Sequence, residues 1–420
     1  MNSNSFGILP RITVFGQSHD PEIGVLIDGL PRGLKLDMEL IESLLERRRP
    51  GQSNLTTPRS ETDTPQIETG IKDGVTTGRQ MRVTFKNSDT RGKDYDRFRV
   101  TPRPSHADYL AVRKYGAEHD IAGGGRFSGR LTLPITFAGA LCLQILREQG
   151  IEIHAKLIEV EGAREGFEKR IIRASHEGDS VGGVVELVAT GLKSGIGEHP
   201  YSGVEPTLSQ ILFAIPGVRG VEFGAGFKAA QMRGSAHNDP WIADGEGSLK
   251  TVTNNAGGVV AGMTTGMDLI VRVAFKPTPS IACGQLTANI ETGKQEVLAI
   301  TGRHDPCIAV RGVPVVEAAC AIGLLNLINL DSTEGATELE GLRGQINTLD
   351  DEIARLYEKR ILVAQKIAHH KKTHDIVGYD PGREQEILDR LTSGKAGEVA
   401  DHITQLYALI FDLSRGKQDA

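Results

Sequence analysis

Residues Pro102–Arg130 read PRPSHADYLAVRKYGAEHDIAGGGRFSGR and set a glycine triplet between a histidine-containing turn and a pair of arginines. Glycine has no Cβ, so backbone N–H groups in such a triplet can come close to an anion. Arg126 and Arg130 are four residues apart, and a helix here would place both guanidinium groups on one face. Guanidinium groups bind phosphate and carboxylate well, and His106 can change protonation near neutral pH. The alternative is a flexible turn with surface arginines, but the combination favours an anion-binding functional site.

Length and composition describe a globular chain of two to three domains. The 420 residues are 39% hydrophobic and carry a formal net charge of −6, and the mean hydropathy is −0.22. No apolar run reaches the length of a membrane-spanning helix, and the N-terminus lacks the features of a signal peptide. Without a basic block, neither nucleic acid nor a membrane is expected as a partner. Four scattered cysteines fit free thiols in a reducing cytoplasm: Cys142, Cys283, Cys307 and Cys320.

From residue 1 to about 330, short apolar runs of strand length alternate with segments of helical period. The expected strands are Gly24–Asp28, Met81–Phe85, Leu131–Ala138, Gly182–Ala189, Gly257–Val260 and Leu269–Phe275. The expected helices are Met38–Arg48, Phe137–Glu148, Leu208–Ile215 and Val315–Leu330. The pattern predicts an α/β or α+β domain with long functional loops.

The pattern changes around residue 331. Residues 331–338 read as a linker, and residues 339–420 read as three helices. The first helix carries an amphipathic stripe of Leu342, Ile346, Leu349, Ile353, Leu356, Val363 and Ile367. Asp380 followed by Pro381 is a helix start that leads to a stop near Gly394. The third helix carries Ile403, Tyr407, Ile410 and Ser414 on one stripe. Because a three-helix domain of this size buries little apolar surface, dimerisation is expected.

Polar residues interrupt the apolar stripes of this tail. Arg360 and Lys371 fall on the stripe that we expect to be buried, and they face the same way because eleven residues make about three helical turns. Ser414 and Gln418 continue the stripe of the third helix. A buried cation needs an anion. Either acidic side chains pair with these cations, or a small dianionic molecule binds between the helices.

Separated motifs in a fixed order give the chain a family resemblance. They are GQSHD with IDGLPRG (Gly16–Gly33), RRRPGQS (Arg47–Ser53), GVTTG (Gly74–Gly78), RPSHAD (Arg103–Asp108), GGGRFSGR (Gly123–Arg130), GVEFGAGF (Gly220–Phe227), NNAGG (Asn254–Gly258), FKPTPSI (Phe275–Ile281) and RHDPC with PVVEA (Arg303–Ala318). Residues 1 to about 330 thereby resemble chorismate synthase, and residues 339–420 resemble the all-helical class of chorismate mutase. The resemblance implies an α+β fold, a layered β-α-β sandwich, followed by an all-α three-helix domain.

For the first domain, the resemblance implies 1,4-anti elimination of phosphate from 5-enolpyruvylshikimate 3-phosphate to give chorismate. Reduced FMN is the implied cofactor, with NADPH as a possible flavin reductant, and no metal is implied. The implied acid–base residues are His19, His106 and Asp305, and the implied anion-binding residues are Arg48, Arg103, Arg130 and Arg303. The implied flavin site comprises Arg126, Phe127, Ser128, His237, Asn238, Ala261, Lys276, Pro277, Thr278, Pro279, Ser280 and Arg303. Gln17, Asp20, Phe127 and Ala261 depart from the family pattern.

For the tail, the resemblance implies rearrangement of chorismate to prephenate without a cofactor. The implied catalytic residues are Arg360, Lys371 and Gln418, and the implied substrate-binding residues are Arg343, Asp380, Arg383, Glu384 and Ser414. The family pairs such domains as dimers and builds tetrameric synthases, so a homotetramer with paired mutase domains is expected. A regulatory tail, or a tail that only assembles the oligomer, stays open.

Overall fold

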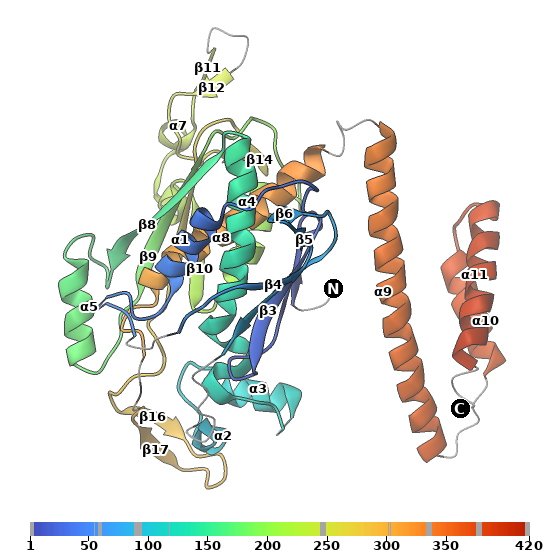
Figure 1. Cartoon of the computed structure of the whole chain (residues 1–420), viewed down its shortest axis with the longest axis horizontal. Coiled ribbons are helices and arrows are strands. Elements are labelled where there is room, and N and C mark those ends of the chain that lie inside the picture. Colours follow the sequence, from blue (N-terminus) through green and yellow to red (C-terminus); the bar gives the residue numbers. More distant parts are fainter. Residues whose placement is uncertain are drawn as a thin grey trace. The chain divides into compact units, whose positions relative to one another are not determined.

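The computed structural model describes residues 4–53, 55–57, 61–87, 95–116, 118–243, 249–300, 302, 304–332, 338–374 and 380–415. The chain divides into two compact units, Met1–Glu334 and Gly335–Ala420. Figure 1 shows strands and helices mixed in the first unit and helices alone in the second.

The first unit is built on two antiparallel sheets. One has the strand order β1-β2-β3-β7-β4, formed by Ser5–Phe6, Arg11–Phe15, Glu22–Asp28, Met81–Lys86 and Gln66–Thr69. The other has the order β10-β15-β9-β8, formed by Val218–Phe223, Leu269–Phe275, Gly183–Thr190 and Glu152–Val160. Buried and partly exposed residues alternate along β9 and β15, so one face of that sheet packs inward. On that face Val185 lies opposite Val273, and Leu187 lies opposite Val271.

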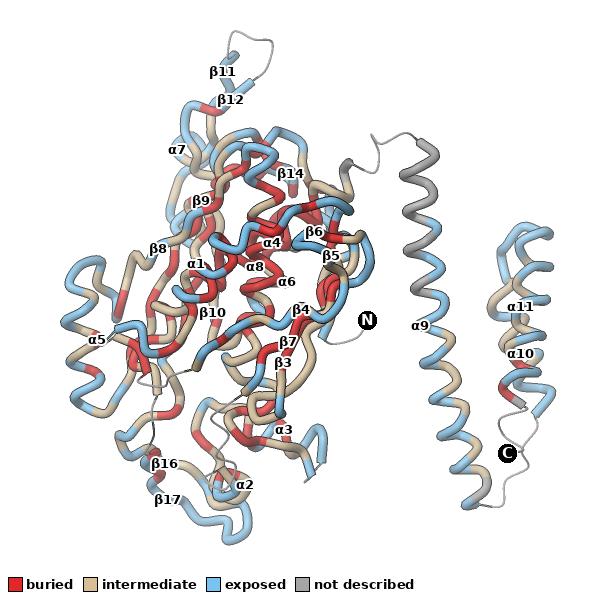
Figure 2. The backbone as a smooth tube through the Cα atoms, viewed as in Figure 1, coloured by how far each residue is buried: buried red, intermediate tan, exposed pale blue. Residues whose placement is uncertain are grey.

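Helices fill the space between the sheets. α4 (Thr132–Glu148) packs on β3 and β7, and α8 (Ala309–Ser332) packs on β8, β9 and β15. The two helices contact each other at Gly139, where a Cβ would lie 2.3 Å from Cβ of Ala318. Glycine is therefore required for this close approach. α1 (Met38–Arg48) and α6 (Val204–Phe213) complete the layer, which is the most buried part of the unit in Figure 2. This arrangement is a layered β-α-β sandwich.

Shorter elements surround this sandwich. The helices are α2 (Arg97–Val100), α3 (Asp108–Tyr115), α5 (Phe167–His176) and α7 (Gly234–His237). The paired strands are β5 (Ile71–Lys72) with β6 (Val75–Thr76), β11 (Trp241–Ala243) with β12 (Leu249–Thr251), β13 (Val259–Val260) with β14 (Met263–Thr264), and β16 (Gln285–Ala288) with β17 (Gln295–Leu298).

One predicted strand is wrong, because Leu131–Ala138 forms the start of α4. A short, wholly apolar run fits a buried strand and a buried helix equally well. The segment becomes a helix because α4 is enclosed on all sides, and Pro134 is tolerated in its first turn. The other predicted helices and strands of this unit overlap elements of the same type, although Gly257–Val260 contributes only the two residues of β13.

Two core helices are long and apolar enough, by length and composition, to cross a membrane. They are Gly129–Glu148 and Ala309–Leu330, whose most apolar windows are 72% and 78% buried inside the protein. No segment of this kind was expected from the sequence. The layers of the sandwich cover these helices, as core helices are covered in other folded domains.

The second unit contains α9 (Glu338–Thr373), α10 (Pro381–Thr392) and α11 (Gly397–Arg415). The predicted start of α10 is confirmed, because the Asp380 side chain accepts a hydrogen bond from the backbone N–H of Arg383 at 3.0 Å. Gly394 follows the helix with φ +73°. The stripe of α11 is also confirmed, because Ile403, Tyr407 and Ile410 are half-buried and Ser414 is buried.

The predicted burial of the α9 stripe is wrong for a single chain. Ile346, Leu349, Ile353, Leu356, Val363 and Ile367 are 48–58% exposed. The sequence shows that a helix is amphipathic, but it does not show whether its apolar side is covered within the same chain. Most of this stripe therefore lacks a covering element among the described residues of the unit.

Candidate active site

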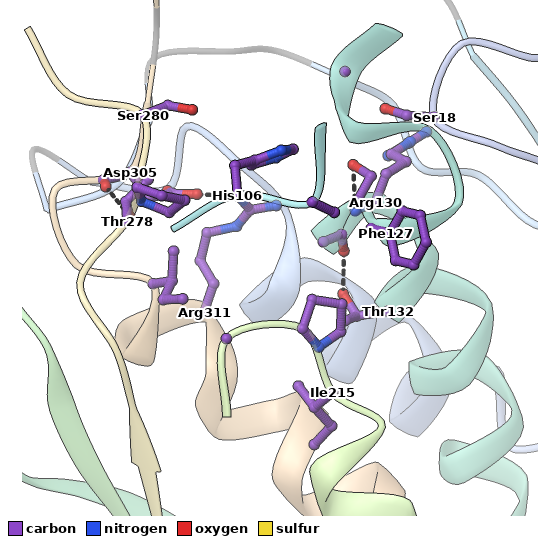
Figure 3. A pocket seen from close by; sticks show the side chains of 18 of the residues that line it. Ser18, His106, Phe127, Arg130, Thr132, Ile215, Thr278, Ser280, Asp305 and Arg311 are labelled. Atoms are coloured by element: carbon purple, nitrogen blue, oxygen red, sulfur yellow. Dashed lines mark hydrogen bonds and ion pairs between the residues drawn. The ribbon is translucent and has the colours of Figure 1, made fainter. Parts of the chain in front are cut away.

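A cavity of about 660 Å³ opens in the first unit where loops from both sheets meet the starts of α4 and α8. Its lining comes from seven parts of the chain, within residues 18–19, 48–61, 87–110, 123–132, 213–218, 275–280 and 304–315. Figure 3 shows Asp305, Thr278 and Ser280 on one side, Ser18, Arg130 and Phe127 on the other, and Ile215 below them. The size and the mixture of apolar and charged walls suit a small-molecule site.

Most of the site residues predicted for the first domain line this cavity. They are His19, Arg48, Arg103, His106, Arg126, Phe127, Ser128, Arg130, Lys276, Thr278, Pro279, Ser280 and Asp305. Pro277 belongs to the same loop but does not reach the lining. Arg303 lies outside the described residues.

His237, Asn238 and Ala261 do not reach the cavity within one chain. His237 ends α7, Asn238 follows it, and Ala261 lies in the turn between β13 and β14 with φ +52°. Figure 1 shows α7 at the opposite end of the unit from α2 and α3. Sequence reasoning placed these residues with the others because a motif does not reveal which end of a sheet its loop occupies.

The glycine triplet is not helical. Gly123, Gly124 and Gly125 have φ values of +58°, +90° and +52°, in the region that favours glycine. A Cβ on Gly123 would lie 2.2 Å from Cε1 of His19. The triplet therefore admits the imidazole of His19 against the backbone. The expected helical face shared by Arg126 and Arg130 is absent, because Ser128 between them is extended with ψ 142°.

Arg48 and Arg130 share a buried carboxylate on one wall of the cavity. Arg48 Nη1 lies 3.3 Å from Asp63 Oδ2, and Arg130 Nη1 contacts Asp63 Oδ1. Arg130 Nη2 also lies 2.7 Å from Glu61 Oε2. Burial, together with the nearby guanidinium groups of Arg311 and Arg130, lowers the pKa of Arg48 to about 9. Positive charge at Arg48 is therefore only partly offset by the carboxylates around it.

The carboxylate of Asp305 is held from two directions on the facing wall. Its Oδ1 accepts a hydrogen bond from the backbone N–H of Thr57 at 2.9 Å, and its Oδ2 pairs with Arg311 Nη1 at 2.7 Å. Arg311 also donates from Nε to the backbone carbonyl of Arg48 at 2.9 Å. Arg311 thus links the two walls through one guanidinium group.

Sequence reasoning did not assign Glu61, Asp63, Asp108 or Arg311 to the site. Asp108 lies inside the RPSHAD motif, and Arg311 lies between RHDPC and PVVEA. The many cations of the motifs were the signal that nearby acidic residues would pair with them. Asp108 is buried beside Arg103 and His106 and pairs with both. Arg103, which is predicted to bind substrate, lines the cavity and is also paired with Asp108.

In the second unit, the structure brings two of the predicted tail residues together. Arg360 Nη1 donates to Ser414 Oγ at 2.6 Å, and the guanidinium carbon lies 5.5 Å from the centre of the Phe411 ring. Arg383 pairs instead with Glu386, one helical turn away on the exposed surface of α10. Lys371 on α9 and Glu384 on α10 are half-buried, while Asp380 is exposed at the start of α10. The side chain of Arg343, and all of Gln418, lie outside the described residues.

The chain matches the family model described as Chorismate synthase over residues 10–328. The chain belongs to the chorismate synthase family. A chorismate synthase of Chitinophaga pinensis is 47% identical over 331 residues, which cover 78% of this chain and 97% of that protein. A chorismate synthase of Korarchaeum cryptofilum is 41% identical over 362 residues, covering 80% of this chain and 100% of the relative.

A solved structure of a chorismate synthase has the same fold, with a TM-score of 0.60 and 22% identity, over 82% of this chain and 98% of the other. The layered α+β fold expected from the motifs is therefore confirmed. Residues 342–419 match the family model described as Chorismate mutase type II. The chain thus contains a chorismate synthase domain followed by a chorismate mutase domain. The first family consists of lyases and the second of isomerases.

Proposed function

We propose that this chain converts 5-enolpyruvylshikimate 3-phosphate to chorismate with reduced FMN, and then rearranges chorismate to prephenate in its helical domain. The observation that carries the first step is the excess of positive charge in the cavity. Its described lining carries the cations Arg48, Arg103, Arg126, Arg130, Lys276 and Arg311 but only the carboxylates Glu61 and Asp305. A substrate with one phosphate and two carboxylates would add negative charge to this cavity.

The residues around the cavity fit a flavin nucleotide. Phe127 is 40% exposed, and it joins the exposed Leu110 and Phe213 among the apolar residues of the lining, where a flat ring system can pack. Lys276 and Arg126 add positive charge for a phosphate group. When bound, reduced FMN supplies the electron density that the elimination requires.

The three proposed proton-transfer groups, His19, His106 and Asp305, all line the cavity. His106 lines it from the turn before α3, and burial lowers the pKa of its imidazole, so the neutral form is favoured near pH 7. The carboxyl group of Asp305 is oriented by contacts with Arg311 and with the N–H of Thr57. His19 packs on Gly123 and lies edge-on to Tyr95, with ring centres 5.3 Å apart. These groups are oriented before a substrate arrives, which favours proton transfer at defined positions.

The proposed mutase step needs no covalent chemistry. The Claisen rearrangement is accelerated by holding a compact conformer and by placing cations near the ether oxygen. Arg360 is suited to this role because Ser414 fixes its guanidinium group at 2.6 Å. Lys371 and Gln418 are the other proposed cationic and hydrogen-bonding groups.

We also propose that mutase domains pair as dimers within a homotetramer located in the cytoplasm. The support is the half-exposed apolar stripe of α9, together with Leu406, Leu409 and Leu413 on α11, which are 46–57% exposed. A second chain can cover surfaces of this kind. NADPH is a proposed reductant for the flavin.

A dual assay on the full chain tests the proposal. Phosphate release and prephenate formation are measured anaerobically with pre-reduced FMN and 5-enolpyruvylshikimate 3-phosphate, and chorismate is supplied separately to the second reaction. Phosphate release without prephenate formation from either source would leave the tail as a regulatory or assembly module. Absence of phosphate release would reject the synthase function.

A further inference from the structure

The turn before α3 contains a buried ion pair between Arg103 and Asp108. Arg103 Nε and Nη2 each lie 2.7 Å from a carboxylate oxygen of Asp108, and the backbone N–H of Arg103 donates to Oδ2 at 3.1 Å. The two side chains are 4% and 1% exposed. The paired geometry matches a guanidinium fork to a carboxylate and fixes the orientation of both groups.

His106 contacts the same carboxylate. Its Nδ1 lies 2.6 Å from Asp108 Oδ1 and 3.1 Å from Arg103 Nη2. A guanidinium nitrogen can only donate, and Nδ1 cannot donate to Asp108 while it accepts from Arg103. Arg103 Nη2 already donates to Asp108 Oδ1, and the carboxylate contact is the shorter one. Nδ1 is therefore assigned the proton, which leaves the lone pair of the neutral ring on Nε2.

Nε2 of His106 lies on the side of the glycine triplet. A Cβ built on Gly124 would be 3.6 Å from this nitrogen. The imidazole is 16% exposed and belongs to the cavity lining. The atom left able to accept a proton is thus directed away from the buried ion pair.

Further contacts hold the guanidinium group of Arg103 in this orientation. Its Nη1 lies 3.2 Å from Ser280 Oγ, and its guanidinium carbon lies 4.6 Å from the centre of the Phe98 ring. Withdrawing Arg103 would leave the buried carboxylate of Asp108 without the guanidinium charge that offsets it, which is costly.

The other side of the turn is also held. Ser105 has φ +58°, unusual for a residue other than glycine, and its carbonyl accepts a hydrogen bond from Lys276 Nζ at 2.6 Å. The charged groups that face His106 are therefore Arg103, Asp108 and Lys276. Only Asp108 among them carries negative charge.

We propose that Arg103 and Asp108 are positioning residues that hold His106 in the Nδ1–H tautomer, with Nε2 presented to the cavity as the proton-transfer atom. This rests on the proposed synthase function for its catalytic meaning. Arg103 then acts through Asp108 and His106, and its role is distinct from the substrate contact that the motif suggested.

The test compares Asp108→Asn with the wild-type chain. We expect kcat for phosphate release to fall about 100-fold, the lower part of what a general acid or base contributes, with KM changed by less than about twofold. When His106 has already been replaced by Ala, adding Asp108→Asn should lower kcat almost no further, because Asp108 acts on the reaction only through the imidazole of His106. A raised KM with an unchanged kcat, or independent multiplicative losses in the double variant, would overturn the proposal.

A second test needs neither flavin nor turnover. Diethyl pyrocarbonate modifies the neutral imidazole, so the extent of His106 modification, measured by peptide mass spectrometry at a series of pH values, gives the midpoint of its titration. Removal of the Asp108 charge should move the midpoint of His106 about one unit to lower pH. An unmoved midpoint would contradict the pairing. This measurement is informative even if the wild-type chain releases no phosphate, an outcome that would reject the synthase function separately.

Glu317→Gln is the matched control. Glu317 is buried and pairs with the exposed Arg47, whose Nη1 lies 2.7 Å from Oε2, and neither residue lines the cavity. This variant should lose stability but keep kcat and the His106 midpoint. If Asp108→Asn does not fold, Arg103→Lys preserves the charge while removing the fork. It should lower kcat with KM retained, and an unchanged kcat would count against the proposal.

Discussion

The assignment of the helical domain can be tested at the contact between Arg360 and Ser414. Replacing Arg360 with Met keeps most of the side-chain length while removing the cation. A preorganised donor at a site of developing charge contributes about 3–4 kcal/mol, so kcat for prephenate formation from chorismate should fall roughly 100- to 1000-fold. The half-burial of Arg360 on α9 supports the lower end of this range.

Ser414→Ala gives a graded second perturbation. Ser414 Oγ accepts a hydrogen bond from Arg360 at 2.6 Å and donates one to the carbonyl of Ile410 at 2.6 Å. Ser414 therefore orients the guanidinium group of Arg360 but carries no charge itself. Loss of one hydrogen bond to a charged group costs about 1.5 kcal/mol at the lower end, which corresponds to roughly tenfold in rate.

The assay follows prephenate formation with added chorismate, and phosphate release from the same preparations is the internal control. Arg390→Met is the matched variant, because Arg390 is an exposed arginine on α10 and its loss changes the net charge equally. Phosphate release should be unchanged in all three variants. Prephenate formation within about twofold of the wild type in Arg360→Met would refute the reasoning, since no catalytic cation contributes so little.

Three further outcomes are expected. Glu61→Gln removes a carboxylate 2.7 Å from Arg130 that competes with an anionic substrate, so KM in the phosphate-release assay should fall about fivefold; a higher KM would contradict this. Phe127→Ser removes an exposed aromatic wall whose ring centre lies 6.3 Å from that of Tyr115, and FMN binding measured by flavin fluorescence should weaken about two- to tenfold; an unchanged Kd would count against it. The pKa of His106 is lowered from 6.5 by burial, so the unfolded chain binds this proton more readily. The free energy of unfolding in urea should therefore decrease as pH falls below 6.5, and His106→Gln should flatten that slope; equal slopes would disprove it.

Several charged residues of the synthase domain have a role that their motifs do not reveal. Arg48, Arg103 and Arg130 were all expected to bind substrate, and each is also paired with a carboxylate of the protein: Arg48 and Arg130 share Asp63, and Arg103 pairs with Asp108. A sequence motif does not show whether its arginine forms an ion pair with an acidic residue in the folded protein. A substrate anion must therefore share Arg130 with Asp63 and Glu61, or be bound mainly by groups such as Arg311 and Lys276.

Local sequence determined those features whose causes lie within a few residues. Asp380 followed by Pro381 starts α10, the apolar period gives α1 at Met38–Arg48, and Asp37 caps it by accepting from the N–H of Leu40 at 3.0 Å. Hydrogen bonds and side-chain spacing of this kind act within one or two helical turns, so they can be read from the chain directly. The ordered motifs likewise identified both domains.

Tertiary structure decided what depends on residues far apart in sequence. Leu131–Ala138 became helical because both sheets and α8 enclose it, and the glycine triplet serves to admit His19, about a hundred residues earlier in the chain. Arg311 joins Asp305 to the backbone of Arg48, across 263 positions. Such contacts are set by how the layers pack, and the free energy of packing depends on the whole arrangement and cannot be read from any single segment.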